Sequence, residues 1–323
     1  MSTDLQHMLD TLGDPSRPVQ DELLESASDL DAAGLQAFQA GWSTWESPRK
    51  LELLEHLGRM ADENIELNFD RVNRLALGDN DPSVRRRAIQ NLWECEDPSL
   101  GERLAALLGA DPSAEVRAVA AAALGRFVYL GEIDEIDEHL LRQVEDRLLA
   151  AQRSDEAEAV RLRSLESLGY SSLPEAVELI EAAYLSRQEM QMQSALKAMA
   201  RSASPAWEEA VVENLHHRAP GLRAEATRAA GELELRGTVD DLIELTDDAI
   251  DDVRLAAIWS LAQIGGPAAT QALTQLLETA QDEDEIALLE DGLDYIAFVD
   301  GTRGVPLLDF DPGDSPDRAG FPP

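Results

Sequence analysis

Histidine and cysteine are common nucleophiles, general bases and metal ligands, so their number and spacing limit the chemistry open to a chain. This chain has one cysteine, Cys95, and five histidines: His7, His56, His139, His216 and His217. No histidine is followed by glutamate, no His-Glu-x-x-His motif is present, and a single cysteine leaves no zinc ligand set. The sequence also lacks a Gly-x-Ser-x-Gly motif and a P-loop. It therefore predicts no catalytic residue, no metal site and no cofactor.

A regular pattern does come from pairs of an apolar residue and an arginine. These pairs are Val84-Arg85, Val116-Arg117, Val160-Arg161, Leu222-Arg223 and Val253-Arg254. They recur at intervals of 32, 44, 62 and 31 residues, and the interval of 62 is two units of 31 whose midpoint falls at Met190-Gln191. Intervals of this size are typical of repeat proteins, in which each unit packs on its neighbours.

Each unit has the same internal plan of two helices. The first starts after Asp-Pro or an acidic cluster and ends near glycine, as at Gly125. The second is often opened by proline and is predicted over residues 98–109, 174–185, 205–217 and 267–279. Proline is favoured in the first turn because its missing N–H needs no partner there, and a preceding aspartate or serine caps the free donors. Together with an aromatic content of only 5%, this plan predicts an all-α protein.

This pattern resembles the HEAT repeat family, in particular the short, alanine-rich subtype named after the phycobilisome lyases. The residues that carry the resemblance span 48–297 and include Asp-Pro-Ser-Val-Arg at 81–85, Val116-Arg117 with Leu124-Gly125, Val160-Arg161 with Leu168-Gly169, and Asp252-Val253-Arg254 with the glycines at 265–266. The resemblance implies a right-handed α-solenoid, an α-α superhelix of stacked helical hairpins. It also implies that the apolar residue of each pair is buried and that its arginine reaches an aspartate or a carbonyl in the neighbouring turn, with Asp81, Asp111 and Asp252 as the expected partners.

Enzymes of this architecture define the alternative to a binding protein. Deoxyhypusine hydroxylase is a HEAT-repeat protein that holds a di-iron centre with His-Glu dipeptides, and no histidine of this chain matches that motif. Phycobilin lyases of the same repeat class attach or isomerise bilins. The resemblance therefore favours a non-enzymatic scaffold that mediates protein–protein interaction. The alternative is a HEAT-repeat enzyme or cofactor-handling protein, either bilin lyase-like or metal-dependent.

The domain organisation follows from where the repeat pattern starts, lengthens and stops. Residues 1–47 are expected to form N-terminal capping helices or a degenerate repeat, and residues 48–308 the solenoid. The solenoid contains a longer unit at 110–153, with an extended helix predicted over 131–155. Residues 309–323 are rich in proline, glycine and acids, which predicts a disordered tail.

The charge balance narrows the choice of partner. The chain has 64 acidic and 27 basic residues, which gives a net charge of −37. A chain this negative repels phosphate backbones and anionic lipid, so neither nucleic acid nor a membrane is an expected partner. The acid excess is equally consistent with adaptation to a salty cytoplasm. The N-terminus has neither a basic segment nor an apolar one typical of signal peptides, so we expect a cytoplasmic protein.

Acidic residues on the predicted second helices form the candidate partner-binding surface. They are Glu175, Glu178, Glu181, Glu208, Glu209, Glu213, Asp240, Asp241 and Glu244. If the second helices line the concave face, these residues form an acidic groove for a basic protein partner. A merely solvated acidic surface explains the same residues, and the sequence leaves both interpretations open. It also leaves the oligomeric state open.

The five tryptophans are spread along the chain at helical positions. Most are expected in the core between repeats, with Trp42 and Trp45 near the N-terminal cap the most exposed. Cys95 is expected to be a small buried residue on the helix that carries Trp93.

Overall fold

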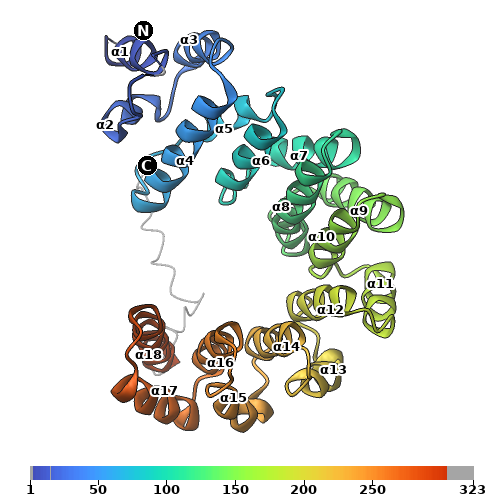
Figure 1. Ribbon diagram of the computed structural model, residues 1–323. Helices are drawn as coiled ribbons and strands as arrows, with labels where there is room; N and C mark the ends of the chain where they lie inside the picture. Colours follow the sequence, from blue (N-terminus) through green and yellow to red (C-terminus); the bar gives the residue numbers. More distant parts are fainter. Residues whose placement is uncertain (1–2, 15, 304–323) are drawn as a thin grey trace, which may run out of the picture. The chain divides into compact units, whose positions relative to one another are not determined.

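The computed structural model describes residues 3–14 and 16–303, and these residues form helices and no strand (Figure 1). The predicted disordered tail, 309–323, lies outside the described residues. The chain divides into two compact units, Met1–Trp207 and Glu208–Pro323. The described residues confirm the all-α prediction.

The α-helices of the first unit are α1 (Thr3–Leu12), α2 (Asp21–Leu24), α3 (Ala32–Trp42), α4 (Ser47–Glu63), α5 (Asp70–Ala76), α6 (Pro82–Asn91), α7 (Pro98–Ala110), α8 (Ala114–Glu132), α9 (Glu138–Ser154), α10 (Glu158–Leu168), α11 (Pro174–Leu185) and α12 (Glu189–Arg201). Those of the second unit are α13 (Glu208–Asn214), α14 (Pro220–Glu232), α15 (Val239–Leu245), α16 (Asp251–Ile264), α17 (Pro267–Thr279) and α18 (Glu283–Arg303). Short 3-10 turns at Glu25–Ala27, Pro205–Trp207 and Arg236–Thr238 complete the regular structure.

The helices begin where the sequence supplies a cap. At α6 the Asp81 carboxylate accepts a hydrogen bond from the backbone N–H of Ser83, and Pro82 is the first helical residue. Asp97 caps α7 in the same way through the N–H of Ser99. A capping side chain satisfies one of the free N–H groups of the first turn, which stabilises a helix by about 1 kcal/mol.

Within the first unit, the helices that carry apolar-arginine pairs, α6, α8 and α10, pack on one another and are flanked by α4 and α12. Figure 1 shows α4, α6, α8, α10 and α12 as one row on the inner side of this unit, with α7, α9 and α11 on its outer side. Small residues allow the close approach: a Cβ on Gly169, directly after α10, would lie 2.5 Å from the carbonyl oxygen of Ala198 in α12. In the second unit α14, α16 and α18 form one row, and α13, α15 and α17 lie on its other side.

The extended helix predicted over 131–155 is two helices. Residues 131–132 belong to α8, the chain turns at residues 133–137, and α9 starts at Glu138. Asp134 takes the left-handed backbone conformation, with φ of 62°, and Asp137 caps α9 through the N–H of His139 at 2.8 Å. The periodicity continues across this break because both helices bury apolar residues in the same hairpin.

The apolar-arginine pairs join one repeat to the next. Their apolar members, Val84, Val116, Val160, Leu222 and Val253, are all buried. Arg85 donates two hydrogen bonds to the carboxylate of Asp111 in the following turn, at 2.8 and 2.7 Å, and another to the carbonyl of Asp79 in its own turn. The same pairing recurs at two further places, Arg117 with Asp155 and Arg223 with Asp248.

The aspartate of each turn also organises its own backbone. The Asp111 carboxylate accepts the N–H of Ser113, just before α8, while its carbonyl accepts a hydrogen bond from Arg117. Two expected partners have other contacts: Asp81 caps α6, and Asp252 pairs with Arg228 of α14. The predictions for Asp81 and Asp252 were wrong. The aspartate that accepts hydrogen bonds from the arginine of the preceding repeat, here called the bridging aspartate, stands five residues before the valine of its own repeat.

Candidate functional site

Trp93 is the centre of the most distinctive surface in the first unit. Helix α6 ends at Asn91, and Leu92 is buried, so the turn that follows carries the Trp93 side chain outward. This side chain is 58% exposed. The two tryptophans expected to be most exposed are buried instead. Trp42 stacks on Phe38 with ring centroids 5.9 Å apart, and Trp45 packs edge-on against the same ring at 5.6 Å.

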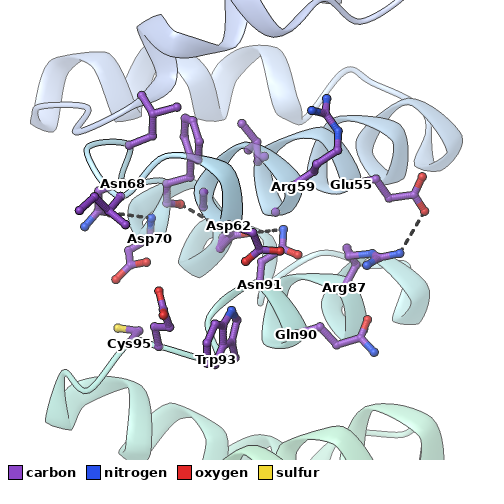
Figure 2. Close-up of a pocket in the computed structure, with 18 residues that line it drawn as sticks. Glu55, Arg59, Asp62, Asn68, Asp70, Arg87, Gln90, Asn91, Trp93 and Cys95 are labelled. Atoms are coloured by element: carbon purple, nitrogen blue, oxygen red, sulfur yellow. Dashed lines mark hydrogen bonds and ion pairs between the residues drawn. The ribbon is translucent and has the colours of Figure 1, made fainter. Parts of the chain in front are cut away.

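A cavity of about 520 Å³ lies on one side of Trp93, between α4, the start of α5 and α6. Figure 2 shows Asp62 of α4 and Asp70 of α5 facing the same hollow as Trp93 and Cys95. The loop between α4 and α5 completes the wall with Ile65, whose side chain is 98% exposed. We refer to this cavity as the acidic cavity.

The charges of this cavity are unbalanced. Its lining contains four carboxylates and two arginines. Both arginines are already paired, since Arg87 contacts Glu55 at 3.2 Å and Arg59 contacts Asp21 and Glu63 outside the lining. The other carboxylates belong to Asp62, Asp70 and Glu94. Among the described residues, Asp62 and Glu94 make no hydrogen bond or ion pair through their side chains.

A second cavity of about 490 Å³ lies on the other side of Trp93, between α6, α7 and α8. Its floor is formed by apolar residues from three helices, Ile89, Leu104, Val119, Ala123 and Phe127. Two arginines stand at its rim, and each has a carboxylate partner: Arg126 pairs with Glu96, and Arg163 pairs with Glu166 at 2.6 Å. We refer to it as the apolar cavity.

The side-chain amides of half-buried Asn91 and buried Asn73 hold α6 against α4 and α5 and so position the acidic cavity. Asn91 donates from Nδ2 to the carbonyl of Leu54 at 2.7 Å and to Oδ1 of Asn73 at 3.0 Å. A Cβ on Gly58 would lie 2.7 Å from Oδ1 of Asn91, so the glycine is what allows α4 to approach. The wall beneath Trp93 is therefore rigidly supported.

Cys95 lies at the edge of both cavities, beyond the end of α6 rather than on it. It is half-buried, and Arg74 approaches its Sγ at 3.4 Å. Burial raises the pKa of the Cys95 thiol above its usual value. The thiol form therefore dominates at neutral pH, and it is a weak nucleophile.

The nine acidic residues predicted to bind a partner do not lie at these cavities. Three are exposed on α11 of the first unit, Glu175, Glu178 and Glu181. In the second unit, three are exposed on α13, Glu208, Glu209 and Glu213, and α15 carries Asp240, Asp241 and Glu244. Helix α11 lies in the outer row of its unit (Figure 1), and the acidic groove stays a prediction.

The histidines are dispersed over the fold. His56 contacts Asp21 at 2.6 Å, His216 contacts Asp241 at 3.0 Å, and His217 accepts the N–H of Ala219 at Nδ1. Within residues 3–14 and 16–303, no group of three histidine, cysteine, aspartate or glutamate side chains is arranged to hold a metal ion. In the same residues no helix is long and apolar enough to cross a membrane.

Rows of paired helices in which each hairpin packs on the next define an α-solenoid of the helical-repeat class. The model of the HEAT repeats matches residues 72–152 and 208–293, which together make up more than half of the chain. The chain belongs to the HEAT repeat family.

Several solved structures are similar to the chain at low sequence identity. The complex of CpcE and CpcF of phycocyanin lyase from Nostoc sp. PCC7120 is 17% identical over 70% of this chain and 94% of that chain, with a TM-score of 0.47. Human deoxyhypusine hydroxylase is 19% identical over 91% and 96%, with a TM-score of 0.31. Importin beta is 11% identical over 90% and 48%, with a TM-score of 0.43. The comparison with curated proteins found no match. Likenesses at this level concern the helical-repeat fold alone.

Proposed function

We propose that this protein is a non-enzymatic HEAT-repeat scaffold that binds a protein partner through the surface around Trp93. The observation that carries the proposal is an exposed indole between two cavities, on a turn that follows the Asn91 hydrogen bond to α4. Tryptophan is enriched among the residues that dominate binding energy at protein interfaces, where it stands beside well-formed pockets. A large exposed aromatic side chain at such a position favours a binding surface.

The charge of the chain favours a basic partner. The net charge is −37, and the acidic cavity has more carboxylates than arginines. The exposed acids of α11, α13 and α15 extend the negative field beyond the cavities. In this proposal they attract a basic partner at long range, which makes the association rate fall as salt rises. The proposed location is the cytoplasm.

Site-specific photo-crosslinking in cells tests the proposal. A photoreactive phenylalanine derivative replaces Gln90, which is exposed and lines both cavities, and in a second variant it replaces Val177 on α11. We expect a partner protein crosslinked at position 90, with the yield reduced by Trp93→Ala. Phe298→Ala is the matched control, because it removes another exposed aromatic ring, 70% exposed, from the second unit.

The outcomes separate the proposal from its alternatives. Equal crosslinking at positions 90 and 177, or a yield that Trp93→Ala leaves unchanged, would place binding elsewhere. Metal analysis and an absorption spectrum of the purified protein test the enzyme alternative. Stoichiometric iron or a visible chromophore would favour a metal-dependent or bilin lyase-like protein.

A further inference from the structure

The two cavities beside Trp93 differ in chemistry although they share a wall. Gln90, Trp93 and Cys95 line both. The acidic cavity has carboxylates on the side facing Trp93, whereas the apolar cavity has an aliphatic and aromatic floor. A partner that fills both must therefore present two different side chains, one on each side of the indole.

The acidic cavity fits a planar cation. Asp62, Asp70 and Glu94 come from α4, α5 and the turn after α6, so they approach a guest from different directions. The neighbouring arginines already have carboxylate partners, which leaves the surplus negative charge for a ligand. An arginine guanidinium stacks on an indole face and donates to carboxylates with its five N–H groups. Lysine has a compact charge and no planar surface to stack.

The apolar cavity fits a bulky aliphatic or aromatic side chain. Ala122 and Ala123 of α8 are small, and this opens space above Leu104 and Phe127. Because the rim arginines are paired with Glu96 and Glu166, an apolar guest does not leave a buried cation without a partner.

Resting on the proposed function, we infer that the Trp93 surface recognises a segment of the partner in which an arginine and a bulky apolar residue stand close together. The arginine enters the acidic cavity and stacks on Trp93. The apolar residue enters the cavity on the other face of the same turn. Trp93 thus contacts two neighbouring side chains of the partner, and the acidic cavity determines that one of them is cationic.

Binding of the full chain to a synthetic array of seven-residue peptides tests this inference. Each peptide has one arginine, lysine, citrulline or glutamate and one leucine, phenylalanine or serine at varied separation. We expect peptides with arginine and an apolar residue to bind at least about fivefold better than their citrulline and serine counterparts. Lysine should bind less well than arginine.

Three variants assign the preference to the cavities. Asp62→Asn with Glu94→Gln should remove the preference for arginine over citrulline and keep that for leucine over serine. Ala122→Leu should fill the apolar cavity, remove the preference for leucine over serine and keep that for arginine over citrulline. Glu175→Gln with Glu178→Gln removes the same charge from α11 and should keep both preferences. All five positions are exposed, and thermal unfolding confirms that the variants fold.

The result that would overturn the inference is a wild-type chain that binds citrulline or lysine peptides as well as arginine peptides. Loss of the arginine preference in the Glu175 and Glu178 control would also overturn it, since the effect would then be one of overall charge. Failure of the proposed function is distinguishable, because in that case Trp93→Ala leaves the crosslinking in cells unchanged.

Discussion

Lys50 Nζ lies 2.7 Å from Asp79 Oδ2, and both side chains are nearly buried, at 11% and 5% exposure. The indole N–H of Trp42 donates to the same oxygen at 2.8 Å, and the ammonium group lies 5.3 Å from the centroid of the Trp42 ring. Asp79 also accepts the N–H of Asp81 and offers its carbonyl to Arg85. Lys50 therefore fills, at the first turn of the series, the role that arginine has in later repeats.

Removing this ammonium group should destabilise the first unit. Lys50→Met keeps most of the side-chain volume but leaves the Asp79 carboxylate buried without a cation, so we expect a loss of about 3–5 kcal/mol in the free energy of unfolding. Urea unfolding measured by tryptophan fluorescence gives the value. Lys50→Arg is the control and should recover most of the loss. A cost below about 1 kcal/mol for Lys50→Met would show that the pair contributes no more than a surface ion pair.

The bridging aspartates predict a loss of stability in acid. Hydrogen bonds from Arg117 lower the pKa of Asp155, and those from Arg223 lower the pKa of Asp248, below the usual 3.8. Because the folded pKa is the lower one, this stability is fully present above pH 3.8 and is lost as the pH falls through the folded pKa values. Melting temperature measured against pH should therefore fall below about pH 4.

The variant Asp155→Asn identifies the source of this acid dependence. It should lower the melting temperature at pH 7 and make the remaining dependence below pH 4 shallower. If the melting temperature of Asp155→Asn falls below pH 4 as steeply as that of the wild type, other carboxylates cause the acid dependence.

The turn that follows Arg161 lacks the bridging aspartate and offers a stabilising substitution. Arg161 donates to the carbonyls of Asp155 and Glu156 in its own turn, but the following turn has Ser186. Ser186 Oγ accepts the N–H of Gln188, as the Asp111 carboxylate accepts that of Ser113. We expect Ser186→Asp to supply the carboxylate and raise the free energy of unfolding by about 1 kcal/mol.

Ser186→Asn is the matched control, because it keeps the size and the cap and carries no charge. The difference between the two variants in thermal unfolding should disappear in Arg161→Met. A difference that persists in that background would rule out Arg161 as the partner.

Glu145 of α9 should give the stability of the fold the opposite pH dependence. Its side chain is buried, with the hydroxyl of Ser171 as hydrogen-bond donor at 2.5 Å. Burial raises the pKa of Glu145 above 4.5, and Glu132 raises it further. Glu145 therefore binds its proton more tightly in the folded state than in the unfolded state. The free energy of unfolding falls as the pH rises through 4.5 towards the folded pKa. Glu145→Gln should raise the melting temperature at pH 7 and have little effect at pH 4.

A gain of equal size at both pH values would mean that Glu145→Gln acts through packing. Glu138→Gln, at an exposed position of the same helix, is the control and should change the melting temperature little at either pH.

The site around Trp93 was harder to predict than the fold. Trp93 follows a strongly periodic helix, and its sequence context does not distinguish the last helical residue from the first residue of the turn. Exposure was expected at Trp42 and Trp45, but these rings pack against Phe38, which lies on the preceding helical turns. The signal that was available is the three acidic residues Glu94, Glu96 and Asp97 between Leu92 and Pro98, which indicate that the chain has left the core.

The sequence by itself determined the all-α repeat architecture, because caps, prolines and the 31-residue interval act through neighbours along the chain and need no knowledge of distant contacts. It also identified the buried valines at 84, 116, 160 and 253. Only the tertiary structure decided which aspartate each arginine reaches, which tryptophan is exposed and that Glu145 is buried. Those properties depend on how one hairpin docks on the next, where residues more than 20 positions apart meet. A repeat pattern gives the spacing of these residues along the chain. It does not tell which side of the stack they face.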